Sequence, residues 1–261
     1  MRGVFLTASL PGVCKTSEGK GQEESEKEMI TSYVCVDLET TGLNPKYEKI
    51  IEIGAVKVVE GQVIDTFSTF VNPGRKLEER IEELTGITQK QVDEAPYIEG
   101  ILPEFLEFCG DFALMGHRIL FDYSFLKKAA VNQKLTFEKK GIDTLRIARR
   151  FLPELPHRTL PYLCEYYGIP HQAHRALQDA EATCRLYQIL LEKYYQEVED
   201  CCKPQILIYQ VEKETPITKP QKERLLRILD QHKLTIDVDI DKLTRSEASR
   251  ITDKILAKYG R

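Results

Sequence analysis

Two carboxylates two residues apart, Asp37 and Glu39, lie at the end of the first convincing strand-like segment of the chain, YVCVDL. On a strand both side chains project from the same face of the sheet, because side chains alternate along the backbone. Two carboxylates on one buried face repel each other and are costly to desolvate unless a cation lies between them. Carboxylate oxygens suit a hard divalent cation such as Mg²⁺ or Mn²⁺. The alternative is an exposed strand face on which water solvates both acids.

Two further acids and a histidine lie near the expected beginnings of helices. Asp122 follows the segment GHRILF, and Asp179 lies in the first turn of the longest helical pattern. The helix dipole favours a carboxylate there, so capping is an alternative to a role in chemistry. His174 lies five residues before Asp179 in the loop HQAHRA, as a surface residue or as a proton-transfer group. His171 and His174 also suggest a zinc pair, but no cysteine or third histidine is near them in the sequence.

The elements that must position these residues follow an α/β pattern. Three strands come first and are joined by short connections, which predicts an antiparallel meander, and helices are interleaved afterwards. The expected strands are 33–38, 50–59, 63–71 and 113–115, and helices are expected from near 77 and over 98–108, 121–131, 144–151, 159–167 and 176–198. We therefore expect a mixed sheet with helical cover, in which Asp37 and Glu39 end a central strand.

Composition indicates a folded protein from a reducing compartment. The 261 residues are 42% apolar and 30% charged, and 37 basic against 41 acidic side chains give a net charge of −4. This balance excludes a strongly cationic tail-type binder, although nucleic-acid binding needs only a local basic face. Seven cysteines without a C-x-x-C pair argue against a zinc ribbon and against a disulfide framework, so we expect a cytoplasmic protein. No apolar run approaches the roughly 20 residues that cross a bilayer, so we expect no membrane association.

Four regions differ in composition. Residues 1–29 are rich in Glu, Lys, Gly and Ser towards their end and predict a flexible leader, and 30–202 form the main domain. Residues 203–218 read as a linker, in which QILIY at 205–209 resembles either a sliding-clamp-binding peptide or a short strand. Residues 219–261 predict a small module of two amphipathic helices, the second starting at the capping box TRSE.

Charge separates the C-terminal part from the main domain. Residues 203–261 carry a net +4, whereas 30–202 carry −7. A solvated surface, docking to the main domain, docking to a polymerase and contact with nucleic acid all remain open for the module.

Three motifs occur in order along the main domain: VDLETTGL at 36–43, GHRILFDYSFL at 116–126 and AHRALQDAEAT at 173–183. Together they resemble the DnaQ-like, DEDD-type 3′–5′ exonuclease family, in the subgroup with a catalytic histidine. The first and third motifs are highly specific as a pair, and the resemblance covers residues 32–195. Within the family, the motifs are similar to the epsilon-subunit and PolC-type exonuclease domains of DNA polymerase III.

This resemblance implies a ribonuclease H-like sheet of antiparallel and parallel strands, and a site that binds two divalent ions, Mg²⁺ or Mn²⁺. Asp37 would bridge the two ions, Glu39 and Asp179 would complete the first metal site, and Asp122 would support the second. Two such ions stabilise both the attacking and the leaving oxygen of a phosphodiester. His174 would be the general base, because its ordinary pKa lies near neutral pH.

The resemblance also implies substrate contacts from Thr40, Leu43 and His117. One position departs from the family, because Arg118 follows His117 where Asn is common; an arginine there could pair with a phosphate. We expect a metal-dependent 3′–5′ exonuclease acting on DNA in proofreading or repair, with single-stranded DNA carrying a 3′ end as substrate. A DNA polymerase subunit is the expected partner for proofreading. The alternatives are an RNA-trimming exoribonuclease and a non-cleaving nucleic-acid-binding protein on the same scaffold.

Overall fold

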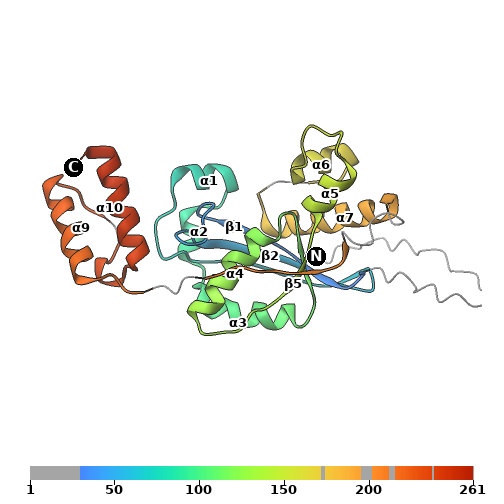
Figure 1. Ribbon diagram of the computed structural model, residues 1–261, viewed down its shortest axis with the longest axis horizontal. Helices are drawn as coiled ribbons and strands as arrows, with labels where there is room; N and C mark the ends of the chain where they lie inside the picture. The colour runs from blue at the N-terminus through green and yellow to red at the C-terminus, as the bar shows by residue number, and fades with distance from the viewer. Residues whose placement is uncertain (1–29, 172–173, 195–201, 212–214, 237, 261) are drawn as a thin grey trace, which may run out of the picture.

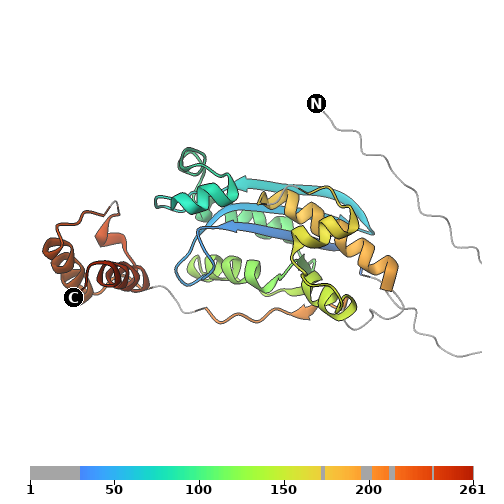
Figure 2. The same cartoon turned by 90° about the horizontal axis from the view of Figure 1, so that it is seen from above.

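The computed structural model describes residues 30–260 apart from 172–173, 195–201, 212–214 and 237 (Figures 1 and 2). The leader expected at 1–29 lies outside the described residues, as does the end of the helix expected at 176–198. None of the helices that the structure describes combines the length and the apolar character needed to span a bilayer.

A six-stranded mixed sheet forms the centre of the main domain, in the order β3-β2-β1-β4-β5-β6. The strands are β1 Tyr33–Thr40, β2 Ile50–Val59, β3 Gln62–Phe70, β4 Leu114–Gly116, β5 Lys140–Asp143 and β6 Gln205–Ile206. The first three form the predicted antiparallel meander, β4 and β5 add parallel pairs, and β6 pairs antiparallel with β5. The prediction of a mixed sheet is confirmed, and QILIY begins with the short strand that was one of its two interpretations.

Strand β1 is central and carries a different set of residues on each face. Its even-numbered residues from Val34 to Leu38 belong to one apolar cluster, and Tyr33 belongs to the cluster on the opposite face. Because side chains alternate, Asp37 and Glu39 share the face of Tyr33. On that face two apolar residues, Tyr33 and Cys35, are thus followed by two acids at the carboxyl end of the strand.

Helices cover both faces of the sheet (Figure 2). Helices α3 Ile98–Cys109 and α4 Leu120–Asn132 supply the apolar cluster on the Val34 face, while α5 Thr144–Phe151, α6 Leu160–Tyr167 and α7 Ala176–Tyr194 supply the one on the Tyr33 face. Two short helices, α1 Glu79–Thr85 and α2 Gln89–Asp93, follow β3. The acids of β1 therefore face the layer that contains α7.

The C-terminal module is a pair of helices with an apolar cluster of its own. It contains α9 Lys219–Gln231, a single 3₁₀ turn at Ile240–Lys242, and α10 Arg245–Tyr259. Both long helices begin with a capping box, at Thr218 and at Thr244, as the sequence predicts for the second. Leu225, Ile228 and Ile255 are among the side chains buried between them. In Figure 1 the module lies beyond α1 and α2, at the end of the molecule opposite the far end of α7.

Candidate active site

Three of the predicted acids converge where β1 ends and α7 begins. Asp37 and Glu39 come from β1, and Asp179 comes from the first turn of α7. One carboxylate oxygen of each lies within 4.8 Å of the other two. Among the residues that the structure describes, these three side chains form a group that could bind a metal ion, and all of their ligand atoms are oxygens.

Gly54 makes this convergence possible. Its position on β2 lies directly under the start of α7, and an added Cβ would lie 2.1 Å from the backbone carbon of Ala176. No side chain fits in that space, so the helix start rests on the strand itself. This close approach brings Asp179, three residues into the helix, over the acids of the neighbouring strand.

Asp122 lies beside the group rather than within it. It is on the first turn of α4, is almost fully buried, and its Oδ1 accepts a hydrogen bond of 3.1 Å from the Leu38 N–H. Helix capping was the alternative for this residue, which lies in the first turn of its helix and also bonds to the backbone of strand β1. Asp122 thereby adds a fourth negative group directly behind Asp37 and Glu39.

Burial and mutual repulsion raise the pKa of three of these acids, Asp37, Glu39 and Asp122. Burial, then the charges of Asp122 and Asp179, raise the pKa of Asp37 well above its usual value. Burial raises the pKa of Asp122 likewise, although the bond from Leu38 opposes the shift. Burial and the charge of Asp179 raise the pKa of Glu39 to about 8. A divalent cation would remove this strain, since it supplies the missing positive charge to an all-oxygen donor set that suits Mg²⁺ or Mn²⁺.

Asp179 has partners from the loop before its helix. The ring Nε2 of His171 contacts Oδ1, and the backbone N–H of His174 donates to Oδ2 at 3.0 Å. His174 has a positive φ of 67°, which is uncommon for a residue other than glycine, and its side chain is half-buried. The loop therefore places the predicted base next to the predicted metal ligand, and it engages His171 as well.

Glu52 and Arg175 are residues of the site that the sequence analysis did not select. Glu52 is 1% exposed and lies opposite Glu39 in the β1–β2 register. Its carboxylate accepts a bond of 3.1 Å from the Arg175 guanidinium and another of 3.1 Å from the Ala176 N–H. It thus holds the start of α7 to β2. The available signal was a single charged residue inside the otherwise apolar segment IIEIGAV, which indicates a buried and partnered acid.

The predicted substrate residues divide into two groups. Thr40 and Leu43 lie on the segment that leaves β1, where Thr40 donates to the Gly42 carbonyl and the Leu43 side chain is 82% exposed. His117 instead faces the interior, with Nδ1 2.9 Å from Thr144 Oγ1 and Nε2 2.7 Å from the Arg158 carbonyl. That carbonyl can only accept, so Nε2 carries the proton, and burial lowers the pKa of the ring.

Arg118, the departure from the family pattern, is exposed next to His117. Its φ is 79°, and its backbone N–H donates to Asp143 Oδ1 at 3.0 Å, which fixes this unusual backbone. His117 and Arg118 therefore point to different environments.

Comparison with known proteins agrees with the geometry. The family described as Exonuclease, RNase_T, matches residues 34–187. The chain is 39% identical over 180 residues to a DNA polymerase III PolC-type from Clostridium perfringens, and 42% identical over 165 residues to that of Bacillus subtilis. These alignments cover 69% and 62% of this chain but only 12% and 11% of the relatives, so the chain corresponds to a small part of each polymerase.

Solved structures share the fold at low sequence identity. The nuclease domain of 3′hExo, described as a DEDDh family member bound to rAMP, has a TM-score of 0.55 at 23% identity and covers 69% of this chain and 98% of that one. E. coli Exonuclease I in complex with a dT13 oligonucleotide has a TM-score of 0.58 at 18% identity and covers 64% and 42%.

The matched family covers more than half of the chain, including both acidic strand residues and the start of α7. The resemblance inferred from the three motifs is thus confirmed, as is the ribonuclease H-like fold that it implied. The chain belongs to the Exonuclease family, whose DEDDh-type members share its fold, and its main domain is a hydrolytic exonuclease domain.

Proposed function

We propose that the protein is a divalent metal-dependent 3′–5′ exonuclease that removes nucleotides from the 3′ end of single-stranded DNA. The observation that carries this proposal is the group formed by Asp37, Glu39 and Asp179, whose oxygens lie within 4.8 Å of one another. Burial and repulsion raise the pKa of two of its members, as expected for acids that are built to share a cation.

Four acids would hold the metal. Asp37 would bridge two ions, with Glu39 and Asp179 completing one site and Asp122 supporting the other. Bound Mg²⁺ or Mn²⁺ would supply positive charge for the attacking and leaving oxygens of the phosphodiester. The protein itself must hold the carboxylate oxygens of the four acids in place. Gly54 and Glu52 contribute by fixing the start of α7, which carries Asp179.

His174 is the proposed general base. Its position before α7 and the bond from its backbone N–H to Asp179 support this role, since an imidazole can accept a proton from water. The segment from Thr40 to Leu43 and the exposed Arg118 are the proposed contacts for the terminal nucleotide and its phosphate. The bonds of the His117 ring to Thr144 and to the Arg158 carbonyl would fix the turn from which Arg118 extends.

The choice of DNA and of a polymerase context rests on the relatives. Polymerase III PolC-type proteins contain a segment up to 42% identical to this chain, and a structural neighbour is described with dT13. This chain spans about an eighth of those polymerases, and a DNA polymerase subunit is the proposed partner in proofreading. None of the cysteines that the structure describes forms a disulfide, which suits the expected cytoplasmic setting.

The test is digestion of a 5′-labelled single-stranded DNA with Mg²⁺, compared with the same strand blocked at its 3′ end and with an RNA of the same sequence. We expect a ladder that shortens from the free 3′ end, no digestion of the blocked strand, and no activity in EDTA. Asp37→Asn, which keeps the shape of the side chain, should be inactive. Digestion of the RNA alone would replace DNA by RNA as substrate, and tight binding without cleavage by the wild type would overturn the enzymatic proposal.

A further inference from the structure

The segment that leaves β1 is closed into a ring by hydrogen bonds at its base. The Thr41 N–H donates to the Lys49 carbonyl at 2.9 Å, and the Lys49 N–H donates back to Thr41 Oγ1 at 3.0 Å. Thr41 follows Glu39 by two residues, so the ring begins where the acidic group ends. We call residues 41–49 the β1–β2 loop. Leu43 belongs to this loop, and its side chain is exposed.

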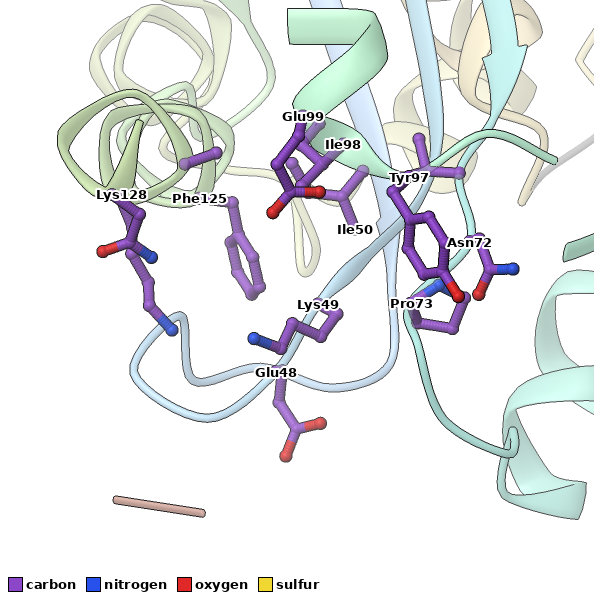
Figure 3. Close-up of a pocket in the computed structure, with 13 residues that line it drawn as sticks. Glu48, Lys49, Ile50, Asn72, Pro73, Tyr97, Ile98, Glu99, Phe125 and Lys128 are labelled. Atoms are coloured by element: carbon purple, nitrogen blue, oxygen red, sulfur yellow. The ribbon is translucent and has the colours of Figure 1, made fainter. Parts of the chain in front are cut away.

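Glu48 holds this loop from within. Its Oε2 accepts a bond of 2.7 Å from the Thr41 hydroxyl, and a Cβ added at Gly42 would lie 3.0 Å from its Cγ. The side chain is 15% exposed. Glu48 also belongs to the lining of a neighbouring hollow of about 190 Å³, together with Ile50 and Phe125, and Figure 3 shows its carboxylate directed away from the side chains of that hollow.

Two arginines from distant parts of the chain meet Glu48. Arg75, which follows β3, contacts Oε2, and Arg250, which is on α10, contacts Oε1. Their side chains are 15% and 21% exposed, so the three charges are largely withdrawn from water. Burial lowers the pKa of Arg75, and the charge of Glu48 opposes that shift. With one oxygen for each guanidinium, the carboxylate is held from both sides.

Arg250 brings the C-terminal module into this arrangement. Two further ion pairs join the module to the main domain, Lys49 with Glu247 at 3.4 Å and Lys254 with Glu78 at 2.9 Å. The apolar side chains of the module, in contrast, form their own cluster. Three ion pairs thus join the module to the main domain, and two of them reach the β1–β2 loop.

We propose that Glu48 is a positioning residue for the substrate-contacting segment beside the acidic site, and that Arg250 completes its function from the C-terminal module. This inference rests on the proposed function, because it takes the residues 40–43 as the contact for the terminal nucleotide. A loop that is already ordered loses less conformational entropy when a strand binds. Release of one side of Glu48 therefore weakens substrate binding and leaves the chemical step unchanged.

The first test is hydrogen exchange, which requires no activity. In Arg250→Ala, amides of the peptide that covers residues 41–49 should exchange faster than in the wild type, and Arg250→Lys should restore most of the protection. Lys222→Ala is the matched control. This substitution also removes one positive charge from the module, but Lys222 pairs with Asp241 inside the module rather than with the main domain. If the amides of the loop exchange at the same rate in Arg250→Ala and in the wild type, the proposal is overturned. This test holds even if the protein cleaves no nucleic acid.

The second test is the kinetics of the same variants on single-stranded DNA with Mg²⁺. We expect Arg250→Ala and Glu48→Gln to raise KM by about three- to tenfold, with kcat unchanged, and Lys222→Ala to match the wild type. The double variant should show a KM close to that of Glu48→Gln alone, because both changes release the same loop. KM effects that multiply in the double variant would mean that Arg250 contacts a substrate phosphate directly, and would overturn the proposal. Loss of all cleavage by the wild type would refute the proposed function and leave the exchange test to decide.

Discussion

Replacing Glu39 by glutamine should stabilise the metal-free protein and remove most of its stabilisation by Mn²⁺. In the folded chain Glu39 is 9% exposed, and burial together with the charges of Asp179 and Glu52 raises its pKa to about 8, while Arg175 opposes the shift. The ordinary value is 4.5. Because the folded value lies above the unfolded one, stability falls as pH rises from 4.5 to about 8 and is constant beyond that window.

The size of the effect follows from this window. At pH 7 the carboxyl is protonated in the folded state and ionised in the unfolded chain, which costs at most about 3 kcal/mol at 1.36 kcal/mol per pH unit. Rearrangement of side chains and water around the ionised form lowers the cost, so we expect Glu39→Gln to gain about 1–2 kcal/mol. For a chain of this length that gain raises Tm by about 2–8 °C.

The assay is thermal unfolding in EDTA and in Mn²⁺, at several pH values from about 5 to about 8. In EDTA the variant should melt above the wild type, by a margin that grows with pH. In Mn²⁺ at a hundred times its Kd the wild type should gain about 2.7 kcal/mol and the variant much less, so the order reverses. Glu104→Gln, which changes an exposed acid on α3, is the control and should leave both curves unchanged. A Glu39→Gln protein that melts below the wild type in EDTA at about pH 8 would refute the reasoning.

Three further predictions follow from other parts of the structure. His174→Ala should lower kcat by about 10²–10⁴-fold, as loss of a general base does, while the rise of Tm in Mn²⁺ is retained; a lost rise would make His174 a ligand. Gly54→Ala should destabilise the fold by about 3 kcal/mol in urea unfolding, since its Cβ would meet the α7 backbone at 2.1 Å, whereas Gly100→Ala meets nothing within 4 Å and should be neutral or better. Burial raises the pKa of Glu247, but Lys49 and its capping bonds outweigh this and lower it below 4.5. Glu247→Gln should therefore melt below the wild type at about pH 6, and the difference should vanish as pH falls through the folded value; a difference that persists in acid would exclude this electrostatic origin.

The sequence predicted the elements well where the pattern was long and uniform. Segments such as 50–59 and 98–108 are strand and helix within one residue of expectation, because their periodicity records which face is buried. The acids of β1 and α7 were selected by their place at the ends of expected elements, but solvation and capping remained as alternatives until the resemblance of the three motifs implied a shared site. The two-residue strand β6 was predicted only as one of two interpretations, since so short an element has no periodicity.

What the sequence did not reveal depends on pairs that are far apart along the chain. Glu52 and Arg175 are separated by 123 residues, and Glu48 and Arg250 by 202. An ion pair of this kind leaves no local signature, because each partner alone looks like one more charged residue. The direction of the His117 ring was likewise decided by Thr144 and Arg158, which only the packed fold brings close.

The bond from the Leu38 amide to Asp122 has a consequence for how inactive variants are interpreted. Strand β1 pairs with β4 only at Val34 and Cys35, so further along the strand a carboxylate takes the place that a neighbouring strand would fill. Asp122→Ala would leave that backbone donor orphaned in the interior, with an energetic cost unrelated to chemistry. An inactive Asp122 variant would thus have lost both a structural hydrogen bond and a negative charge. Variants of Asp37 test the loss of a carboxylate from the site more directly.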